Sequence, residues 1–476
     1  TEAIAAYRQA LALAKQHDQG NQDLTRLYSS LGRALELNSQ FDEALANYGE
    51  LDGVARQQGD RRMELAALMA QITLYATPTS LHDPVKGPAL GQEALALARE
   101  LGDQDAEVRT LWTLALCGMW SGRTAEGIVY AEEAAAMARQ LDLTELLAYA
   151  LNDLGMLYAT VLQLEQAKLA LYEAGKLWRE LDNLPMLTDS MSMACMAHVA
   201  AGEYDQAIVL SDEAFQMSAS SNNLWGQSYS RMMICWAYWE LGQPEQALTM
   251  ANESVHLGKL AGFIASQVLA GGHQAVIYGN LGAIEQGLTI AQQAVSVAET
   301  QFPHFRCHPL GILAQLHLLA GNLTEAEAIV EEGRKDPYAG AHPTWNMRIH
   351  IAEAELALRQ GDYEQAIAVT DDWLPRLRAN NIRTYLVIFL HLRSRALLAT
   401  GQAEAARPDL VEAQDIATAI GSRSALWPIL CNLSQLETNP TEANRLHRQA
   451  REIVETIASH IGAADLQASF LNQPAV

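Results

Sequence analysis

The sequence predicts an all-α fold, a solenoid of about eleven antiparallel helical hairpins, and three observations carry this prediction. A turn followed by a helix pattern recurs about every 40 residues, as in AGEYDQAI at 201–208 and QGDYEQAI at 360–367. Small residues recur at fixed places within each repeat. The composition is rich in Ala and Leu, and Gly and Pro gather between the periodic segments, which is typical of helices joined by short turns.

The repeat around Ala207 illustrates the expected unit. Helix A is predicted over about 185–200, Gly202 forms the turn, and helix B is predicted over about 204–219. Glycine adopts the left-handed conformation that ends many helices at little steric cost. The acidic residue after it, Glu203, suits the positive end of the helix that follows.

Close packing of the two helices explains the small residues. Where the helices of a hairpin cross, both need a small side chain. Helix B supplies one at a position that we call the anchor, helix A supplies one twelve residues earlier, and a third small position follows seven residues after the anchor. Tyr75 departs from the second position, and Leu51 and Trp373 from the third. The anchors are Ala3, Ala44, Gly87, Gly127, Ala167, Ala207, Ala247, Gly287, Ala326, Ala366, Ala406 and Ala443.

This pattern resembles the tetratricopeptide repeat, whose small residues fall at the same relative places in helices A and B. The resemblance covers nearly all of the chain and implies a right-handed superhelix in which helix A lines a concave groove. The longer period resembles the C-terminal repeat domains of bacterial STAND-type signalling ATPases, including maltose-activator-like regulators. The last segment, ADLQASFLNQPAV at 464–476, is similar to the closing sequence of such chains.

We expect a single solenoid over 1–476. Residues 1–20 would be a helix B left from a preceding unit, 21–437 the regular repeats, and 438–476 a shortened last unit with a C-terminal cap. Because the sequence begins at Thr1 within a helix-B pattern, we expect a fragment of a longer protein.

Composition excludes several classes of partner. The net charge of −24 argues against nucleic acid, which is bound by neutralising phosphates, and against an anionic membrane surface. No apolar run of 18 residues or more could span a membrane. Five cysteines without close pairs favour a reducing compartment, so we expect a cytoplasmic protein.

Motifs that carry catalysis are missing from the sequence, which contains no GxxxxGK[ST], GxGxxG, HExxH, GxSxG or CxxC. We therefore predict no enzymatic activity and no cofactor. Cys195, Cys235 and Cys431 fall at the small position of helix A, where cysteine acts as a small apolar residue. The group PHFRCHP at 303–309 offers too few ligands for zinc, so no metal site is predicted.

A ligand would bind on the concave face of the solenoid. The groove-facing positions of helix A lie 18, 15, 11, 8 and 7 residues before each anchor. Aromatic residues and methionines at these positions suit adaptable binding, although part of the stripe could instead be core between neighbouring repeats. The predicted ligand-binding residues are Arg109, Trp112, Met119, Trp120, Tyr149, Asn152, Met156, Asp189, Ser192, Met196, Tyr229, Met232, Trp236, Trp239 and Glu240, continued by Arg348, Glu355, His391 and Arg395.

The resemblance implies a non-enzymatic sensor domain that binds a peptide or protein inducer in this groove. Such a domain would regulate an upstream STAND NTPase module that lies outside this chain. The alternative is a constitutive protein–protein interaction scaffold, or a peptide-binding adaptor without a switch.

Overall fold

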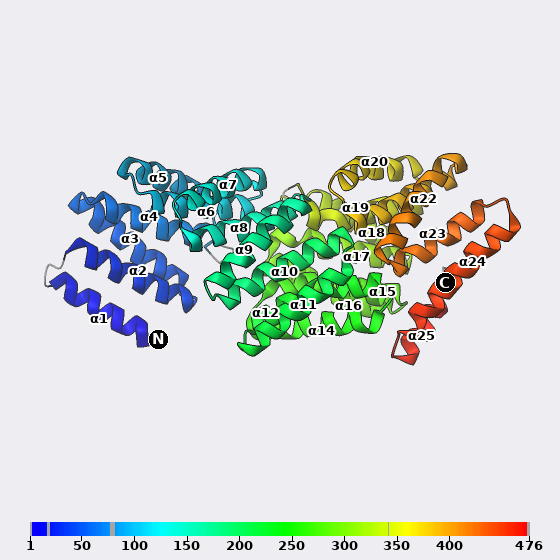
Figure 1. Ribbon diagram of the computed structural model, residues 1–476, viewed down its shortest axis with the longest axis horizontal. Helices are drawn as coiled ribbons and strands as arrows, with labels where there is room; N and C mark the ends of the chain where they lie inside the picture. Colours follow the sequence, from blue (N-terminus) through cyan, green and yellow to red (C-terminus); the bar gives the residue numbers. More distant parts are fainter. Residues whose placement is uncertain (1, 17–19, 77–80, 341, 474–476) are drawn as a thin grey trace. The chain divides into compact units, whose positions relative to one another are not determined.

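The computed structural model describes residues 2–16, 20–76, 81–340 and 342–473. Within these ranges the chain forms helices and turns and no strands, which confirms the all-α prediction (Figure 1). No helix in the described part is long and apolar enough to cross a membrane.

The chain divides into two compact units, 1–157 and 158–476, whose boundary falls inside a helix. The prediction of a single solenoid over 1–476 stays a prediction. The first unit contains α1 (Glu2–Gln16), α2 (Asn21–Leu37), α3 (Phe41–Gln58), α4 (Arg61–Ala76), α5 (Lys86–Leu101), α6 (Gln104–Trp120), α7 (Thr124–Gln140) and most of α8 (Thr144–Thr160).

The second unit contains the remaining helices. They are α9 (Leu164–Glu180), α10 (Leu184–Ala201), α11 (Tyr204–Ser220), α12 (Leu224–Met232), α13 (Ile234–Glu240), α14 (Pro244–Ala261), α15 (Ile264–Asn280), α16 (Ile284–Gln301), the 3-10 turn η1 (Pro303–Phe305), α17 (Cys307–Ala320), α18 (Leu323–Arg334), α19 (Pro343–Gln360), α20 (Tyr363–Ala379), α21 (Arg383–Ala399), α22 (Ala403–Ile420), α23 (Arg423–Leu436), α24 (Pro440–Ser459) and α25 (Ala464–Leu471).

The hairpin of α10 and α11 shows why the sequence folds locally as expected. The side chain of Asn183 accepts a hydrogen bond from the backbone N–H of Met186 (3.2 Å) and so caps the start of α10. Gly202 ends that helix with a φ of +71°, a conformation that favours glycine. Helix α11 then begins at Tyr204, where the sequence predicts the start of helix B.

The crossing of helices A and B occurs at the small residues that the repeat predicts. A Cβ atom built on Gly287 would lie 2.7 Å from the carbonyl oxygen of Ala275, which is twelve residues earlier. A Cβ on Gly127 would lie 2.9 Å from the carbonyl oxygen of Ala115, at the same spacing. The anchor Ala207 is fully buried. Backbone contact at the crossing therefore explains why these positions hold small residues, with Tyr75 as the exception.

Candidate functional site

Helices A from α13 onwards line a cavity of about 690 Å³, which we call the inner cavity. Its wall comes from α13, α15, α17, α19, α21 and α23, with contributions from α24 and from the segment around α25. Helices B of the repeats face away from it, apart from Ile457 of α24. A volume of this size lies within the range of cavities that hold small ligands.

Seven of the residues predicted for ligand binding line the inner cavity together. These are Trp236, Trp239 and Glu240 of α13, Arg348 and Glu355 of α19, and His391 and Arg395 of α21. They lie at the groove-facing positions of three helices A, so the repeat brings them to one wall. Whether a ligand binds them stays a prediction.

Glu355 forms the ionic centre of one wall. Its carboxylate accepts hydrogen bonds from Arg395 Nη1 (2.5 Å) and Arg395 Nη2 (3.1 Å), and from Arg359 Nε (3.1 Å). Burial would raise the pKa of Glu355, but the two guanidinium groups hold that pKa below its usual value. Both arginines thus have a carboxylate partner already.

His391 is a neutral member of the same wall. Burial and the neighbouring Arg395 lower the pKa of His391 to about 3. Asn432 Nδ2 lies 2.9 Å from His391 Nε2 and can donate to it only when that nitrogen is unprotonated. His391 therefore orients Asn432 and carries no charge near neutral pH.

Arg348 is the arginine of the cavity without a carboxylate partner. It is 3% exposed, and its guanidinium lies 4.1 Å from the centre of the Trp236 ring. Its Nε and Nη2 atoms make no hydrogen bond within the described part of the chain. The nearby carboxylate of Glu240 instead accepts hydrogen bonds from the hydroxyls of Ser422 and Ser424 (2.7 Å for Ser424).

Contacts between helices far apart in sequence close the second unit around the inner cavity, and we call them the closing contacts. In each, a side chain donates to a backbone carbonyl near the end of an earlier helix A, and in the first three pairs the donor lies at the start of a later helix. The pairs are Thr344 Oγ1 to Ala159 O (2.7 Å), Arg383 Nε to Ala201 O (2.6 Å), Arg423 Nη1 to Leu241 O (2.7 Å) and Gln473 Nε2 to Asn280 O (2.8 Å). The last carbonyls of a helix lack partners inside the helix, so these donors satisfy them.

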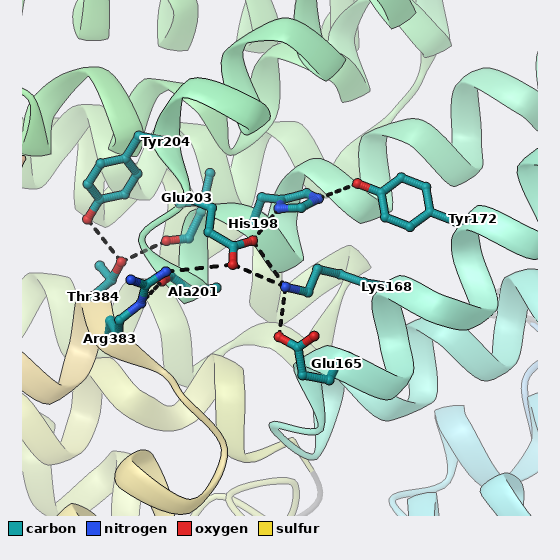
Figure 2. A network of polar contacts seen from close by, with 10 residues as sticks. Glu165, Lys168, Tyr172, His198, Ala201, Glu203, Tyr204, Arg383 and Thr384 are labelled. Atoms are coloured by element: carbon teal, nitrogen blue, oxygen red, sulfur yellow. Dashed lines mark hydrogen bonds and ion pairs between the residues drawn. The ribbon is translucent and has the colours of Figure 1, made fainter. Parts of the chain in front are cut away.

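Figure 2 shows the closing contact between α10 and α21. Thr384 Oγ1 donates to the carbonyl oxygen of Val199 (2.7 Å) and lies 3.0 Å from the hydroxyl of Tyr204, which can donate to it. Arg383 lies beside Glu203, with 3.6 Å between Nη2 and Oε1. The contact joins residues that are 180 to 185 positions apart in sequence.

Glu203 links this contact to α9, which carries Lys168 and Tyr172. Its carboxylate lies 3.1 Å from Lys168 Nζ and 2.5 Å from His198 Nδ1, and His198 Nε2 lies 2.5 Å from the hydroxyl of Tyr172 (Figure 2). Burial lowers the pKa of His198, so the neutral ring donates to Glu203 and accepts from Tyr172. Each polar group in this network has a partner.

The predicted residues of the first unit lie together in part. Trp112 of α6 stacks on Tyr149 of α8, with ring centres 5.0 Å apart, and its Nε1 donates to Asp153 (2.6 Å). Arg109 is exposed and pairs with Asp105 (2.7 Å). Trp120 and Met156 are half-buried.

Several predicted residues are covered by neighbouring helices. Tyr229 of α12 packs against Phe263, and its hydroxyl lies 3.8 Å from the sulfur of Met196. The exposure expected of a groove surface is not found for these residues, because the helices of adjacent repeats cover them, and ligand binding through them stays a prediction. The covered residues are Met119 (1% exposed), Asn152 and Ser192 (2% each), Met232 (2%), Asp189 (7%) and Tyr229 (8%).

Further residues of the cavity were not singled out from the sequence. Asn432 and Gln435 of α23 line the inner cavity, as do Gln315 and Leu319 of α17. All four lie 11, 8 or 7 residues before an anchor, so the position rule would have found them if it had been applied to every repeat. Trp427 of α23 lies outside the rule.

The cysteines and histidines of the described residues form no metal site: no group of three possible ligands lies close enough to hold an ion. All five cysteines have free thiols. Burial raises the pKa of Cys195 and of Cys235 to about 12, which keeps these thiols protonated.

Comparison with known proteins supports the fold. The family model of the tetratricopeptide repeat matches residues 231–253, 308–332 and 347–371. A Rap protein solved in complex with Competence and Sporulation Factor is similar over 75% of this chain and 98% of its own, with 12% identity and a TM-score of 0.55. Aspartyl phosphate phosphatase F from Bacillus subtilis is similar over 71% of this chain and 94% of its own, with 12% identity and a TM-score of 0.50. No curated protein sequence matches the chain significantly. The fold is thus a solenoid of the tetratricopeptide-repeat type.

Proposed function

We propose that the second unit is a binding module that holds a short peptide, or an extended segment of a partner protein, in the inner cavity. The observation that supports this proposal is the cavity of about 690 Å³. Its wall contains tryptophans, arginines and glutamates. A cavity of this size admits a short chain and excludes a folded domain. The Rap protein of similar fold was solved with Competence and Sporulation Factor bound, so such a solenoid can hold a ligand.

The proposal extends to regulation. By its resemblance to STAND-type proteins, the chain would be the sensor that controls an upstream NTPase module in the cytoplasm. A ligand shifts a conformational equilibrium only if it prefers one of the states. The closing contacts are the candidates for the element that changes, because a wider or narrower cavity requires the helices that they join to move.

A pool of synthetic pentapeptides tests binding in the cavity. The pool is passed over the immobilised chain, and the retained peptides are sequenced. Leu319→Trp fills the cavity, because Leu319 lines it and is 38% exposed, so a larger side chain can be accommodated. Leu260→Trp is the matched control, because Leu260 is 62% exposed on α14 and does not line the cavity.

Peptides that bind the unaltered chain and Leu260→Trp, and bind Leu319→Trp at least tenfold more weakly, support the proposal. Equal binding to both variants, or no retained peptide at all, refutes binding in the inner cavity. The regulatory part has its own test in the gene that encodes Thr1. A phosphate-binding GxxxxGK[ST] motif upstream in the same reading frame supports a sensor, and a reading frame without a nucleotide-binding module contradicts it.

A further inference from the structure

Arg348 of α19 is a buried cation whose bonding capacity the chain leaves partly unused. A guanidinium carries five N–H donors, and a buried donor without an acceptor destabilises the folded state. Arg348 is 3% exposed, and its Nε and Nη2 atoms have no acceptor within the described residues. A buried charge without a partner is costly, so its presence needs an explanation outside the chain's own contacts.

The immediate surroundings of Arg348 add a second donor, and the neighbouring hydroxyl of Tyr385 leaves Nε and Nη2 without an acceptor within the described residues. The guanidinium lies over the Trp236 ring, and Trp236 Nε1 is itself buried without a hydrogen-bond partner in the described part of the chain. Both side chains line the inner cavity. Burial lowers the pKa of Arg348, and the attraction of Tyr385 and Glu240 opposes this shift without overcoming it.

Among the described residues, neither carboxylate of the cavity forms an ion pair with Arg348. Glu355 is bonded to Arg395 and Arg359, and Glu240 is bonded to two serine hydroxyls. Burial raises the pKa of Glu240. The three arginines and two glutamates of the wall leave a net charge of +1, which one monovalent anion would balance.

We infer that the inner cavity is a carboxylate-binding site, in which Arg348, together with Trp236, receives the carboxylate of a ligand whose apolar body lies among the aromatic side chains. This inference rests on the proposed function and specifies the chemistry of its ligand. A planar carboxylate matches the guanidinium fork, and its single charge matches the excess of the cavity better than the charge of a phosphate dianion does. The carboxylate is that of a peptide C-terminus or of a small organic acid.

Benzoate and benzamide test the inference, because they share a ring and differ in charge. We expect 10 mM benzoate, at a dissociation constant in the low millimolar range, to raise the midpoint of thermal unfolding by about 1–2 °C. Benzamide and inorganic phosphate should each raise it by less than a quarter of that amount. Equal effects of benzoate and benzamide, no effect of benzoate, or a larger effect of phosphate would overturn the inference.

Arg348→Met assigns the effect to this side chain, because methionine keeps much of the apolar stem without the charge. It should abolish the benzoate response. Arg376→Met is the matched control, because Arg376 is an exposed arginine that pairs with Asp372 (3.0 Å) and does not line the cavity, and it should keep the response. A benzoate response that survives in Arg348→Met refutes the inference. If Arg348→Met does not fold, Arg348→Lys replaces it, with an expected tenfold or greater loss of benzoate affinity; unchanged affinity refutes the inference.

Peptides separate this inference from the proposed function. Each peptide retained from the pool is made with a free and with an amidated C-terminus. Binding of the free acid at least tenfold tighter than of the amide supports a peptide terminus as the source of the carboxylate. Equal binding of both forms overturns the carboxylate inference and leaves the proposed function standing. Benzoate binding without any peptide binding supports a small organic acid and overturns the proposed function.

Discussion

Thr384→Val is the sharpest perturbation of the closing contacts, because valine keeps the shape of threonine and removes its hydroxyl. Thr384 Oγ1 donates a hydrogen bond to the carbonyl oxygen of Val199 (2.7 Å) and accepts one from the hydroxyl of Tyr204 (3.0 Å). Both side chains are buried, with Thr384 3% and Tyr204 2% exposed. In the variant, the carbonyl oxygen of Val199 still accepts a hydrogen bond from the N–H of Gly202 (3.1 Å). The hydroxyl of Tyr204 loses its hydrogen-bond partner within the described residues.

These contacts give the expected magnitude. Loss of the hydrogen bond to Val199 costs about 1 kcal/mol, and leaving the buried Tyr204 hydroxyl without a partner costs about 1–3 kcal/mol. Thr384→Val should therefore lower the free energy of unfolding of the second unit by about 2–4 kcal/mol. Urea unfolding followed by circular dichroism measures this change.

The matched control is Thr289→Val, which removes an exposed hydroxyl bonded to the backbone of the same helix at Glu285 (2.9 Å). Its effect should stay within about 0.5 kcal/mol. Hydrogen exchange should also accelerate at the start of α21 and the end of α10 in Thr384→Val and remain unchanged in the control. Equal stability of the two variants, together with unchanged exchange, would refute the claim that these contacts hold the second unit closed.

Two more predictions concern stability. Burial lowers the pKa of His308 and His391 to about 3 and that of His342 to about 4, so only the unfolded chain takes up their protons near pH 6.5. The stability that these neutral histidines contribute is complete above pH 6.5 and is lost as the pH falls towards their pKa values in the folded state. The free energy of unfolding should fall by about 4 kcal/mol between pH 7.5 and 5.5. Urea midpoints that stay constant over this range would contradict the prediction. Gly311→Ala should destabilise the second unit by about 1–3 kcal/mol, because its Cβ would meet the backbone of α19 at 2.3 Å. Gly271→Ala, with no atom within 4 Å, should instead stabilise helix α15 by up to about 1 kcal/mol, and thermal melts that rank the two variants the other way would contradict the reasoning.

Features that depend on local spacing could be predicted from the sequence. The anchor Ala207 and the turn at Gly202 follow from a period and from the conformational freedom of glycine. Seven of the predicted ligand-binding residues, including Trp236 and Arg348, line one cavity because the groove-facing positions of stacked repeats face the same side. These relations involve one repeat and its neighbours, so a sequence pattern contains them.

Features that depend on the path of the whole solenoid could not be predicted. The pairing of Thr384 with Val199, and of Ser424 with Glu240, requires small rotations between repeats to add up over more than four units. No residue pattern within one repeat encodes that sum. For the same reason the sequence predicted an open groove, whereas Ser192 and Met232 are buried. The sequence also could not show that Nε and Nη2 of Arg348 lack hydrogen-bond partners within the described residues.

The closing contacts also limit how this chain can evolve. In an ordinary solenoid each repeat touches only its neighbours, so repeats can be gained or lost with little effect on the others. In the second unit, three successive helix ends meet partners at a nearly constant separation of 182 to 185 residues. Deletion of one repeat between them would move every partner out of place at once. The number of repeats between the partners is therefore constrained by these contacts, and variation in that segment among relatives of this chain should appear as substitutions within repeats rather than as changes in their number.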